Sequence, residues 1–321
     1  MEQLRTDGSL RHLVTLEGLS RSLLEQLLER SQQFVRPLGE KPPQRRSLDG
    51  VTVATLFTEP STRTRVSFEL AAQRLGAKVA SVEMQLSSRL KGESMLDTVR
   101  TLESLHVDVF VLRDPQAEVP DFVARNVLPH VSVLSGGAGS DAHPTQGLLD
   151  ALTVLQHKQR IAGLSIAIVG DIRHSRVARS AWRVFSTLGA VDIRIVAPAA
   201  LQPDADEFAD CHRSLSIDTG IAGCDVVMML RIQKERIAET AIPDSAQYFA
   251  EWGLTAERLR RAKPDAIVMH PQPMNREVEI ASDVADGPQS AIRDQVSNGV
   301  AVRMAVLEAV IEGRALAAST T

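Results

Sequence analysis

The fold is decided by a stretch that runs from residue 51 to residue 75, VTVATLFTEPSTRTRVSFELAAQRL. It opens with an apolar run of strand length, Val51–Phe57. A helical pattern follows, in which Phe68, Ala72 and Leu75 share one face. The stretch therefore predicts a strand that leads directly into a helix, which is the repeating unit of parallel α/β sheets.

The same alternation recurs along the chain. Runs rich in Val, Ile or Leu alternate with helix-sized segments, at Val51–Phe57, Lys78–Val82, Val107–Leu112, Val131–Leu134, Leu164–Val169, Val191–Val196, Asp225–Leu230 and Ala266–Met269. This βαβ pattern is typical of parallel sheets that helices cover on both faces. Eight strands allow either one closed barrel or two four-stranded sheets. We favour two doubly wound α/β domains, because a long helical pattern, Pro144–Arg160, lies near the middle of the chain.

Helical patterns near both ends complete the predicted organisation. The first covers Leu16–Val35, with Ser20 as its cap and with one apolar face made of Leu19, Leu23, Leu27 and Leu28. A proline-containing loop, Arg36–Asp49, follows it. The last pattern, Asn298–Ile311, is expected to pack back on the first domain. The predicted domains are residues 1–150 with 294–321, and residues 151–293.

The composition narrows the class of protein. A chain of 321 residues is about twice the usual domain length, and 44% hydrophobic residues supply two cores. The net charge of −4 argues against a general binder of nucleic acid or of membrane surfaces. Cys211 and Cys224 show neither metal-ligand spacing nor a disulfide framework. Without a signal-peptide pattern or an apolar run of about 18 residues, the sequence predicts a cytoplasmic protein.

The first strand ends at a segment suited to anions. Ser61 is a natural N-cap for the helix that follows, and the N–H groups of the first helical turn have no intrahelical acceptor. Together with the hydroxyl groups of Thr62 and Thr64, these N–H groups would form an anion cradle. The sequence therefore predicts a phosphate site here.

Two arginines in the same turn support this interpretation. Arg63 and Arg65 face the positive end of the helix dipole, which costs about 0.3–1 kcal/mol each unless an anion sits between them. The alternative is an ordinary capped helix whose arginines point to solvent or pair with Glu59 or Glu69.

Two further strand ends carry polar side chains. Arg113 follows the run Val107–Leu112, although pairing with Asp114 would give it a purely structural role. The run Val131–Leu134 is followed by a glycine-rich loop, Ser135–Ser140, and then by His143, Pro144, Thr145 and Gln146. Pro144 suits the first helical position, so His143 would sit at the cap and Gln146 in the first turn. A capping histidine without a chemical role is the alternative.

The strand ends of the second half are also basic. Gly170–Arg176 occupies the place of a dinucleotide loop but lacks its second and third glycines, so we reject NAD. Its Arg173 and Arg176 offer guanidinium groups for carboxylates. Arg231–Arg236 is again basic, and the prolines of His270–Arg276 leave carbonyls free to accept hydrogen bonds. His270 alone is expected to be structural.

These strand ends predict a site for small anionic molecules without a covalent nucleophile. Arginines recur at five of them, together with His143 and Gln146. The sequence shows no Ser–His–Asp set, no pair of catalytic carboxylates and no metal-ligand cluster. Neither a cofactor nor a metal is expected.

The motifs resemble those of one family. Ser61–Arg65, STRTR, resembles the carbamoyl-phosphate motif of the aspartate and ornithine carbamoyltransferases, and His143–Gln146, HPTQ, resembles their second shared motif. Ornithine enzymes typically carry a His-Cys-Leu-Pro loop near the C-terminus, whereas the sequence here, His270–Pro273, is similar to the aspartate enzymes. Arg231–Gln233 is similar to their aspartate-binding Arg-x-Gln. Lys91–Glu93 resembles the family's loop whose lysine reaches the neighbouring subunit's site.

The resemblance implies a carbamoyl-phosphate-binding first domain and an aspartate-binding second domain. The phosphate of carbamoyl phosphate would be bound by Ser61, Thr62, Arg63 and Thr64. Its carbonyl oxygen would be polarised by Thr64, Arg113 and His143. Its amino group would be held by Gln146 and by the backbone of Gln272 and Pro273. The carboxylates of L-aspartate would be held by Lys91, Arg176, Arg231 and Gln233.

The resemblance also implies a homotrimer with shared active sites, and some relatives join regulatory chains or dihydroorotase. Two positions depart from the common pattern: Asp114 stands where many relatives have His, and Gly147 where Ala is common. Neither is expected to abolish activity. The competing hypotheses are carbamoyl transfer to ornithine or to an acylated ornithine, a non-catalytic homologue that binds a partner enzyme, and a dinucleotide-dependent oxidoreductase.

Overall fold

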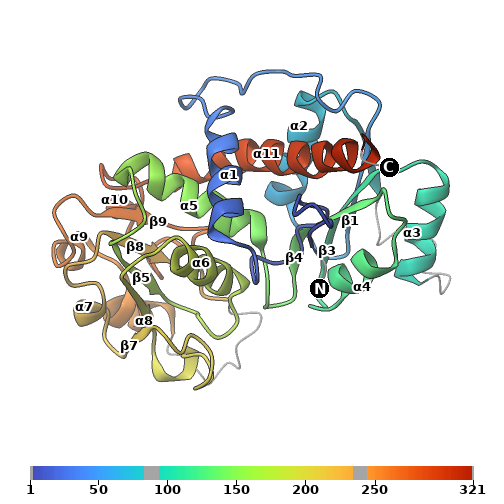
Figure 1. The fold of residues 1–321 in the computed structure, drawn as a ribbon. Coiled ribbons are helices and arrows are strands. Elements are labelled where there is room, and N and C mark those ends of the chain that lie inside the picture. Colours follow the sequence, from blue (N-terminus) through green and yellow to red (C-terminus); the bar gives the residue numbers. More distant parts are fainter. Residues whose placement is uncertain (1–2, 83–93, 234–243, 320–321) are drawn as a thin grey trace. The chain divides into compact units, whose positions relative to one another are not determined.

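The computed structural model describes residues 3–82, 94–233 and 244–319, and the chain divides into two compact units. Unit 1 comprises Met1–Leu148 and Ser297–Thr321, and unit 2 comprises Leu149–Val296. Each unit is an α/β structure built on a parallel sheet, which confirms the predicted fold class (Figure 1). Within the described residues, no helix combines the length and the apolarity needed to span a bilayer.

Unit 1 contains a four-stranded parallel sheet in the order β2-β1-β3-β4. Its strands are β1 (Thr52–Phe57), β2 (Lys78–Val82), β3 (Val109–Asp114) and β4 (Ser132–Ala138). Its helices, apart from two that it shares with unit 2, are α1 (Arg21–Gln32), α2 (Thr62–Arg74), α3 (Met95–Ser104) and α4 (Val119–Asn126). The chain leaves β1 for β2 on one side and reaches β3 on the other, so the topological switch point lies between β1 and β3.

Unit 2 contains a five-stranded parallel sheet in the order β7-β6-β5-β8-β9. Its strands are β5 (Ser165–Val169), β6 (Asp192–Val196), β7 (His212–Ser214), β8 (Val226–Met229) and β9 (Ile267–Met269). Its helices are α6 (Arg176–Thr187), α7 (Ile217–Gly220), α8 (Ser245–Trp252), α9 (Ala256–Leu259) and α10 (Ser282–Ala285), with a 3₁₀ turn at Ala199–Leu201. Here the switch point lies between β5 and β8. Helices α5 (Pro144–Lys158) and α11 (Ile292–Ser319) each contribute residues to both units.

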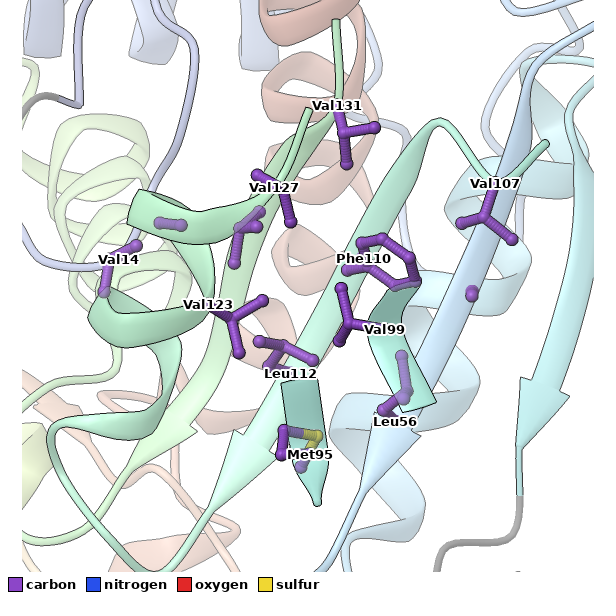
Figure 2. Packing of buried hydrophobic residues seen from close by; sticks show 13 residues of the cluster. Val14, Leu56, Met95, Val99, Val107, Phe110, Leu112, Val123, Val127 and Val131 are labelled. Carbon is purple, nitrogen blue, oxygen red and sulfur yellow. The ribbon is translucent and has the colours of Figure 1, made fainter. Parts of the chain in front are cut away.

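A core in unit 1 fills the space between one face of the sheet and helices α3 and α4. Figure 2 shows Phe110 and Leu112 of β3 directed towards Val99 of α3 and Val123 of α4. These side chains are fully shielded from solvent. Full burial of one such side chain stabilises the fold by about 1.5–3 kcal/mol. This core therefore fixes the position of β3 and of the residues at its carboxyl end.

Four expectations from the sequence are corrected by the structure. The second sheet has five strands instead of four, because the short and polar β7 extends its edge. Residues 135–138, expected in a loop, belong to β4, since pairing with β3 continues to Ala138. Helix α11 begins at Ile292, six residues before the predicted start. In α1, Leu24 is buried in the core while Leu23 is only half-buried, although Leu19, Leu27 and Leu28 are buried as predicted.

Two local predictions are confirmed. Ser20 caps α1 by accepting a hydrogen bond from the N–H of Leu23 at 3.2 Å. The predicted apolar face of α2, which comprises Phe68, Ala72 and Leu75, is fully buried.

Candidate active site

The switch point of unit 1 is formed by the segments that follow β1 and β3. Helix α2 starts at Thr62, after a short segment that follows the end of β1 at Phe57, with Ser61 at the N-cap position. The Ser61 side chain accepts no hydrogen bond from the helix, so the prediction of a side-chain cap is wrong. The first turn of α2 therefore presents its N–H groups without a serine cap, which suits it to an anion. Arg65 Nε lies 4.0 Å from Glu69 Oε1, as in the structural alternative, but this pair is loose and partly exposed.

Arg113 is the second-to-last residue of β3, so it lies inside the strand instead of after it. Its Nη1 donates to the carbonyl of Gly136 at 3.0 Å, and its Nε lies 3.2 Å from Glu59 Oε2. Both of these contacts join Arg113 to segments outside its own strand. The guanidinium is thus oriented by β4 and by the segment after β1, and only 13% of the side chain is exposed.

Asp114 accepts hydrogen bonds that connect two strand ends. Its Oδ2 accepts from the hydroxyl of Thr58 at 2.8 Å, and its Oδ1 accepts from the N–H of Gln116 at 3.0 Å. The N–H of Thr58 also donates to the carbonyl of Arg113 at 3.0 Å. The residue that departs from the family pattern therefore ties the end of β1 to the end of β3.

Gly136 brings three parts of this region together. A Cβ atom at this position would lie 3.1 Å from Phe57 Cζ, 3.4 Å from the carbonyl of Leu112 and 3.5 Å from Thr64 Cγ2. The residue also accepts the hydrogen bond from Arg113. Two of the predicted site residues, Thr64 and Arg113, consequently lie against the same glycine of β4.

The second motif lies at the start of α5. Pro144 is the first residue of the helix, as predicted, and His143 and Gln146 are 5% and 8% exposed. The N–H groups of Gln146 and Gly147 donate to the carbonyl of His143 at 2.9 and 3.2 Å. The backbone of His143 is therefore held by the first turn of α5, shortly after the end of β4.

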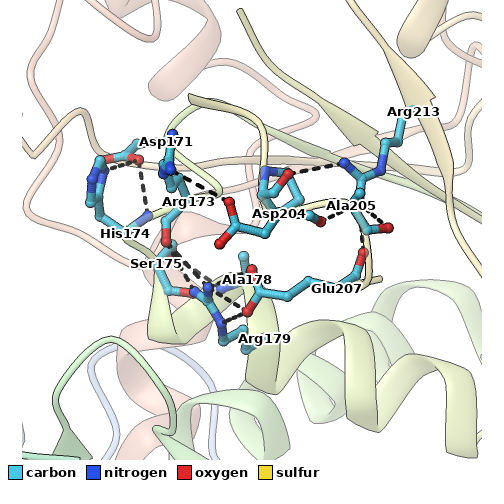
Figure 3. Close-up of polar contacts among 11 residues, drawn as sticks. Asp171, Arg173, His174, Ser175, Ala178, Arg179, Asp204, Ala205, Glu207 and Arg213 are labelled. Carbon is cyan, nitrogen blue, oxygen red and sulfur yellow. Dashed lines mark hydrogen bonds and ion pairs between the residues drawn. The ribbon is translucent and has the colours of Figure 1, made fainter. Parts of the chain in front are cut away.

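The loop after β5 forms one side of the switch point in unit 2, and Figure 3 shows how its charges are used. Asp171 is fully buried, and its Oδ1 accepts from the N–H and from ring Nδ1 of His174 at 3.2 and 2.9 Å. Arg173 pairs with Asp204 at 3.4 Å, which gives it a surface role. Ser175 caps α6 by accepting from the N–H of Ala178 at 3.1 Å.

Other cations in Figure 3 hold the loops in place. Arg179 donates to both carboxylate oxygens of Glu207, at 2.7 and 2.8 Å. Arg213 donates to the backbone carbonyls of Pro203 and Glu207, among others. Arg176, in contrast, is the first residue of α6 and is 9% exposed.

The segment after β8 packs closely against the loop after β5. A Cβ atom at Gly170 would lie 2.9 Å from the carbonyl of Leu230, and Gly170 has a φ of +123°. Gln233 Nε2 donates to the carbonyl of His174 at 3.1 Å. The structure therefore joins Arg231–Gln233 to Asp171–Arg176, as neighbouring carboxyl ends of parallel strands require.

The segment after β9 carries His270 and Gln272. His270 is fully buried, and its Nε2 lies 3.2 Å from Oε1 of the buried Glu279. Burial raises the pKa of the nearby Tyr248, and the negative charges of Glu279 and Asp171 raise it further. Reasoning from sequence missed Glu279, which no motif marks. Lys91, the remaining predicted site residue, lies outside the described residues.

Comparisons with known proteins agree with this arrangement. Residues 11–156 match the carbamoyl-P binding domain of the aspartate/ornithine carbamoyltransferases, and residues 162–310 match their Asp/Orn binding domain. The chain is similar to the aspartate transcarbamoylase of Trypanosoma cruzi in complex with carbamoyl phosphate, with 31% identity, a TM-score of 0.84, and coverage of 94% of this chain and 96% of that chain. For the same enzyme with N-(phosphonacetyl)-L-aspartic acid, the identity is 32%, the TM-score 0.84 and the coverage 94% and 96%.

The fold is shared more widely. The ornithine carbamoyltransferase of Thermus thermophilus is similar with a TM-score of 0.82 at 24% identity, over 94% of this chain and 99% of that chain. Two parallel sheets with basic side chains at their switch points define the class as a two-domain α/β carbamoyltransferase. The chain belongs to the aspartate/ornithine carbamoyltransferase family.

Proposed function

We propose that this carbamoyltransferase transfers the carbamoyl group of carbamoyl phosphate to the α-amine of L-aspartate, a reaction of pyrimidine biosynthesis. The products are N-carbamoyl-L-aspartate and phosphate. The observation that carries the proposal is the placement of Arg231 and Gln233 after β8, beside the loop after β5, at the switch point of unit 2. A guanidinium and an amide at this position suit a carboxylate, which aspartate has on its side chain and ornithine lacks.

Unit 1 supplies the groups for carbamoyl phosphate. The first turn of α2 and the side chains of Ser61, Thr62, Arg63 and Thr64 bind the phosphate. Arg113 lies against the same glycine as Thr64, so both can donate to the carbonyl oxygen of the substrate. His143, fixed at the start of α5, is the third donor to that oxygen, and Gln146 holds the amino group.

Unit 2 supplies the groups for L-aspartate. Arg176, Arg231 and Gln233 bind its carboxylates, with Lys91 as a further cation. The backbone of Gln272 and Pro273 accepts from the amino group of carbamoyl phosphate. Gln233 already donates one hydrogen to the carbonyl of His174, which fixes the direction of its amide.

The reaction proceeds without a covalent enzyme intermediate. The neutral α-amine attacks the carbonyl carbon, the carbonyl oxygen gains negative charge, and the C–O bond to phosphate breaks as the carbonyl reforms. The departing phosphate takes the proton of the amine. Donors aimed at the charged oxygen contribute about 2.7–4 kcal/mol each in comparable sites. Orientation of two anions that repel each other in water supplies a further part of the acceleration.

The assay that tests the proposal compares L-aspartate with ornithine as the acceptor. We expect carbamoyl transfer to aspartate and none to ornithine. Arg231→Ala should raise KM for aspartate about 10- to 150-fold, which corresponds to the loss of one charge-assisted hydrogen bond of about 1.5–3 kcal/mol. The exposed Arg260 provides the control, because Arg260→Ala removes the same charge elsewhere in unit 2.

Two results would overturn the proposal. Faster transfer to ornithine or to an acylated ornithine would reassign the acceptor. No transfer to either, together with no binding of N-(phosphonacetyl)-L-aspartate by calorimetry, would indicate a homologue that only binds a partner enzyme.

We also propose a cytoplasmic homotrimer in which Lys91 of one chain acts in the site of its neighbour. The support is the family membership and the similarity of Lys91–Glu93 to the family's loop. Both cysteines are free, which agrees with a reducing compartment. Sedimentation of the purified protein tests the trimer.

A further inference from the structure

The loop that follows β9 is held by hydrogen bonds at three of its backbone N–H groups, of which the first is buried and the other two are partly buried. The N–H of His270 donates to Gln295 Oε1 at 2.8 Å, and the N–H of Gln272 donates to Nδ1 of His270 at 2.9 Å. The N–H of Asn275 donates to Glu279 Oε1. Hydrogen bonds therefore fix the backbone before, within and after residues 271–274.

The hydrogen bonds that His270 makes to the loop and to Glu279 depend on one tautomer of its ring. Nδ1 accepts from the N–H of Gln272, so it carries no proton. A neutral imidazole must then carry its proton on Nε2, which lies 3.2 Å from Glu279 Oε1. The carboxylate can only accept, so it stabilises this tautomer and no other. His270 and Glu279 are both fully shielded from solvent, where a fixed hydrogen bond is strong.

The conformation that these hydrogen bonds hold carries a backbone cost at Gln272. Gln272 has a φ of +57°, in the left-handed region that costs a residue with a side chain about 1–2 kcal/mol. Its N–H reaches Nδ1 of His270 in this conformation. Such a backbone persists when its surroundings over-determine it, and these residues commonly lie at functional sites.

We propose that Glu279 is a positioning residue for carbamoyl transfer: by holding His270 in the Nε2–H tautomer, it fixes the backbone of Gln272 and Pro273 for the amino group of carbamoyl phosphate. This inference rests on the proposed function for the role of that backbone. Glu279 itself does not touch the substrate. Its carboxylate contacts both ends of the loop, at the ring of His270 and at the N–H of Asn275.

Three variants separate this role from general stabilisation. Glu279→Ala removes the acceptor, while Glu279→Gln keeps one oxygen that can accept from His270 and Asn275. Asp225→Ala is the matched control, because Asp225 is a buried acid of unit 2 that accepts from the N–H of Ser165 at 2.9 Å, away from this loop. We expect Glu279→Ala to lower kcat/KM for carbamoyl phosphate about 100-fold, the cost of a misplaced positioning group.

Two further measurements, inhibition by phosphate and the activity of Glu279→Gln, distinguish a positioning role from general destabilisation. Inhibition by inorganic phosphate, which the first turn of α2 would bind, should stay unchanged in Glu279→Ala. Glu279→Gln should recover most of the lost kcat/KM. If Glu279→Ala does not fold, Glu279→Asp takes its place, because its shorter side chain withdraws the carboxylate from the loop.

The tautomer can be measured independently of activity. In ¹⁵N-histidine-labelled wild-type protein, His270 should show a protonated Nε2 and an unprotonated Nδ1. A protonated Nδ1 would overturn the inference, and so would kinetics of Glu279→Ala that equal those of Asp225→Ala. If the wild-type protein does not carbamoylate aspartate, the proposed function fails, whereas comparing the tautomer of His270 in wild-type protein and in Glu279→Ala still decides whether Glu279 sets the state of His270.

Discussion

Replacement of Asp114 tests how the end of β1 is joined to the end of β3. The residue is 3% exposed and accepts hydrogen bonds from the hydroxyl of Thr58 at 2.8 Å and from the N–H of Gln116 at 3.0 Å. A hydrogen bond to a charged group contributes about 1.5–3 kcal/mol, so two would contribute about 3–6 kcal/mol. The Thr58 hydroxyl also lies 3.0 Å from the carbonyl of Arg113, which provides an alternative acceptor. We therefore expect Asp114→Ala to lower the free energy of unfolding by about 3 kcal/mol.

Asp114→Asn refines the test. Its amide oxygen keeps one acceptor, and the rotating Thr58 hydroxyl can accept from the amide NH₂. The expected loss is about 1 kcal/mol, the size of an ordinary neutral hydrogen bond. Urea unfolding of both variants measures these differences, with Asp141→Ala as the control because Asp141 is an exposed acid of the same unit.

The same variants should affect the site. Loss of the Asp114 contacts loosens the strand ends that carry Arg113, so KM for carbamoyl phosphate should rise in Asp114→Ala and less in Asp114→Asn. Wild-type urea midpoints for both variants would refute the idea that this carboxylate joins the two strands.

Three further predictions concern the site and its supports. His143→Ala should lower turnover about 10²–10³-fold with little change in KM, as expected for a lost donor to the developing oxyanion; steady-state kinetics measure this, and an unchanged turnover would exclude the role. Mixed oligomers of Lys91→Ala and Arg63→Ala chains should regain part of the activity that each variant lacks, because one shared site would have both residues intact; no recovery would indicate that each chain forms its own site. Gly170→Ala should destabilise the protein by about 1–3 kcal/mol, because its φ of +123° and the Leu230 carbonyl 2.9 Å from the new Cβ both oppose a side chain; thermal unfolding measures the loss, and a wild-type midpoint would show that the loop adjusts freely.

Local patterns were enough to predict the elements of regular structure that carry an apolar face. Eight strands were recognised because each contains a cluster of Val, Ile, Leu or Met, which is buried in most of them, although the edge strand β2 has no fully buried residue. The buried face of α2 followed from helical spacing. β7 was not predicted because His212–Ser214 is a short and largely exposed edge strand without such a cluster. The end of β4 escaped because its glycines suggest a loop, whereas pairing with β3 decides its conformation.

By itself, the sequence determined the class of fold, the motifs of a carbamoyltransferase and the chemical types of the site residues, since each of these is a property of adjacent residues. Only the tertiary structure decided which partners these residues have. Arg113 donates to the carbonyl of Gly136, 23 residues further along the chain, and His270 binds Glu279. The physical reason is that burial leaves each polar group only the partners that chain packing brings within about 3 Å, and these partners lie outside any local pattern.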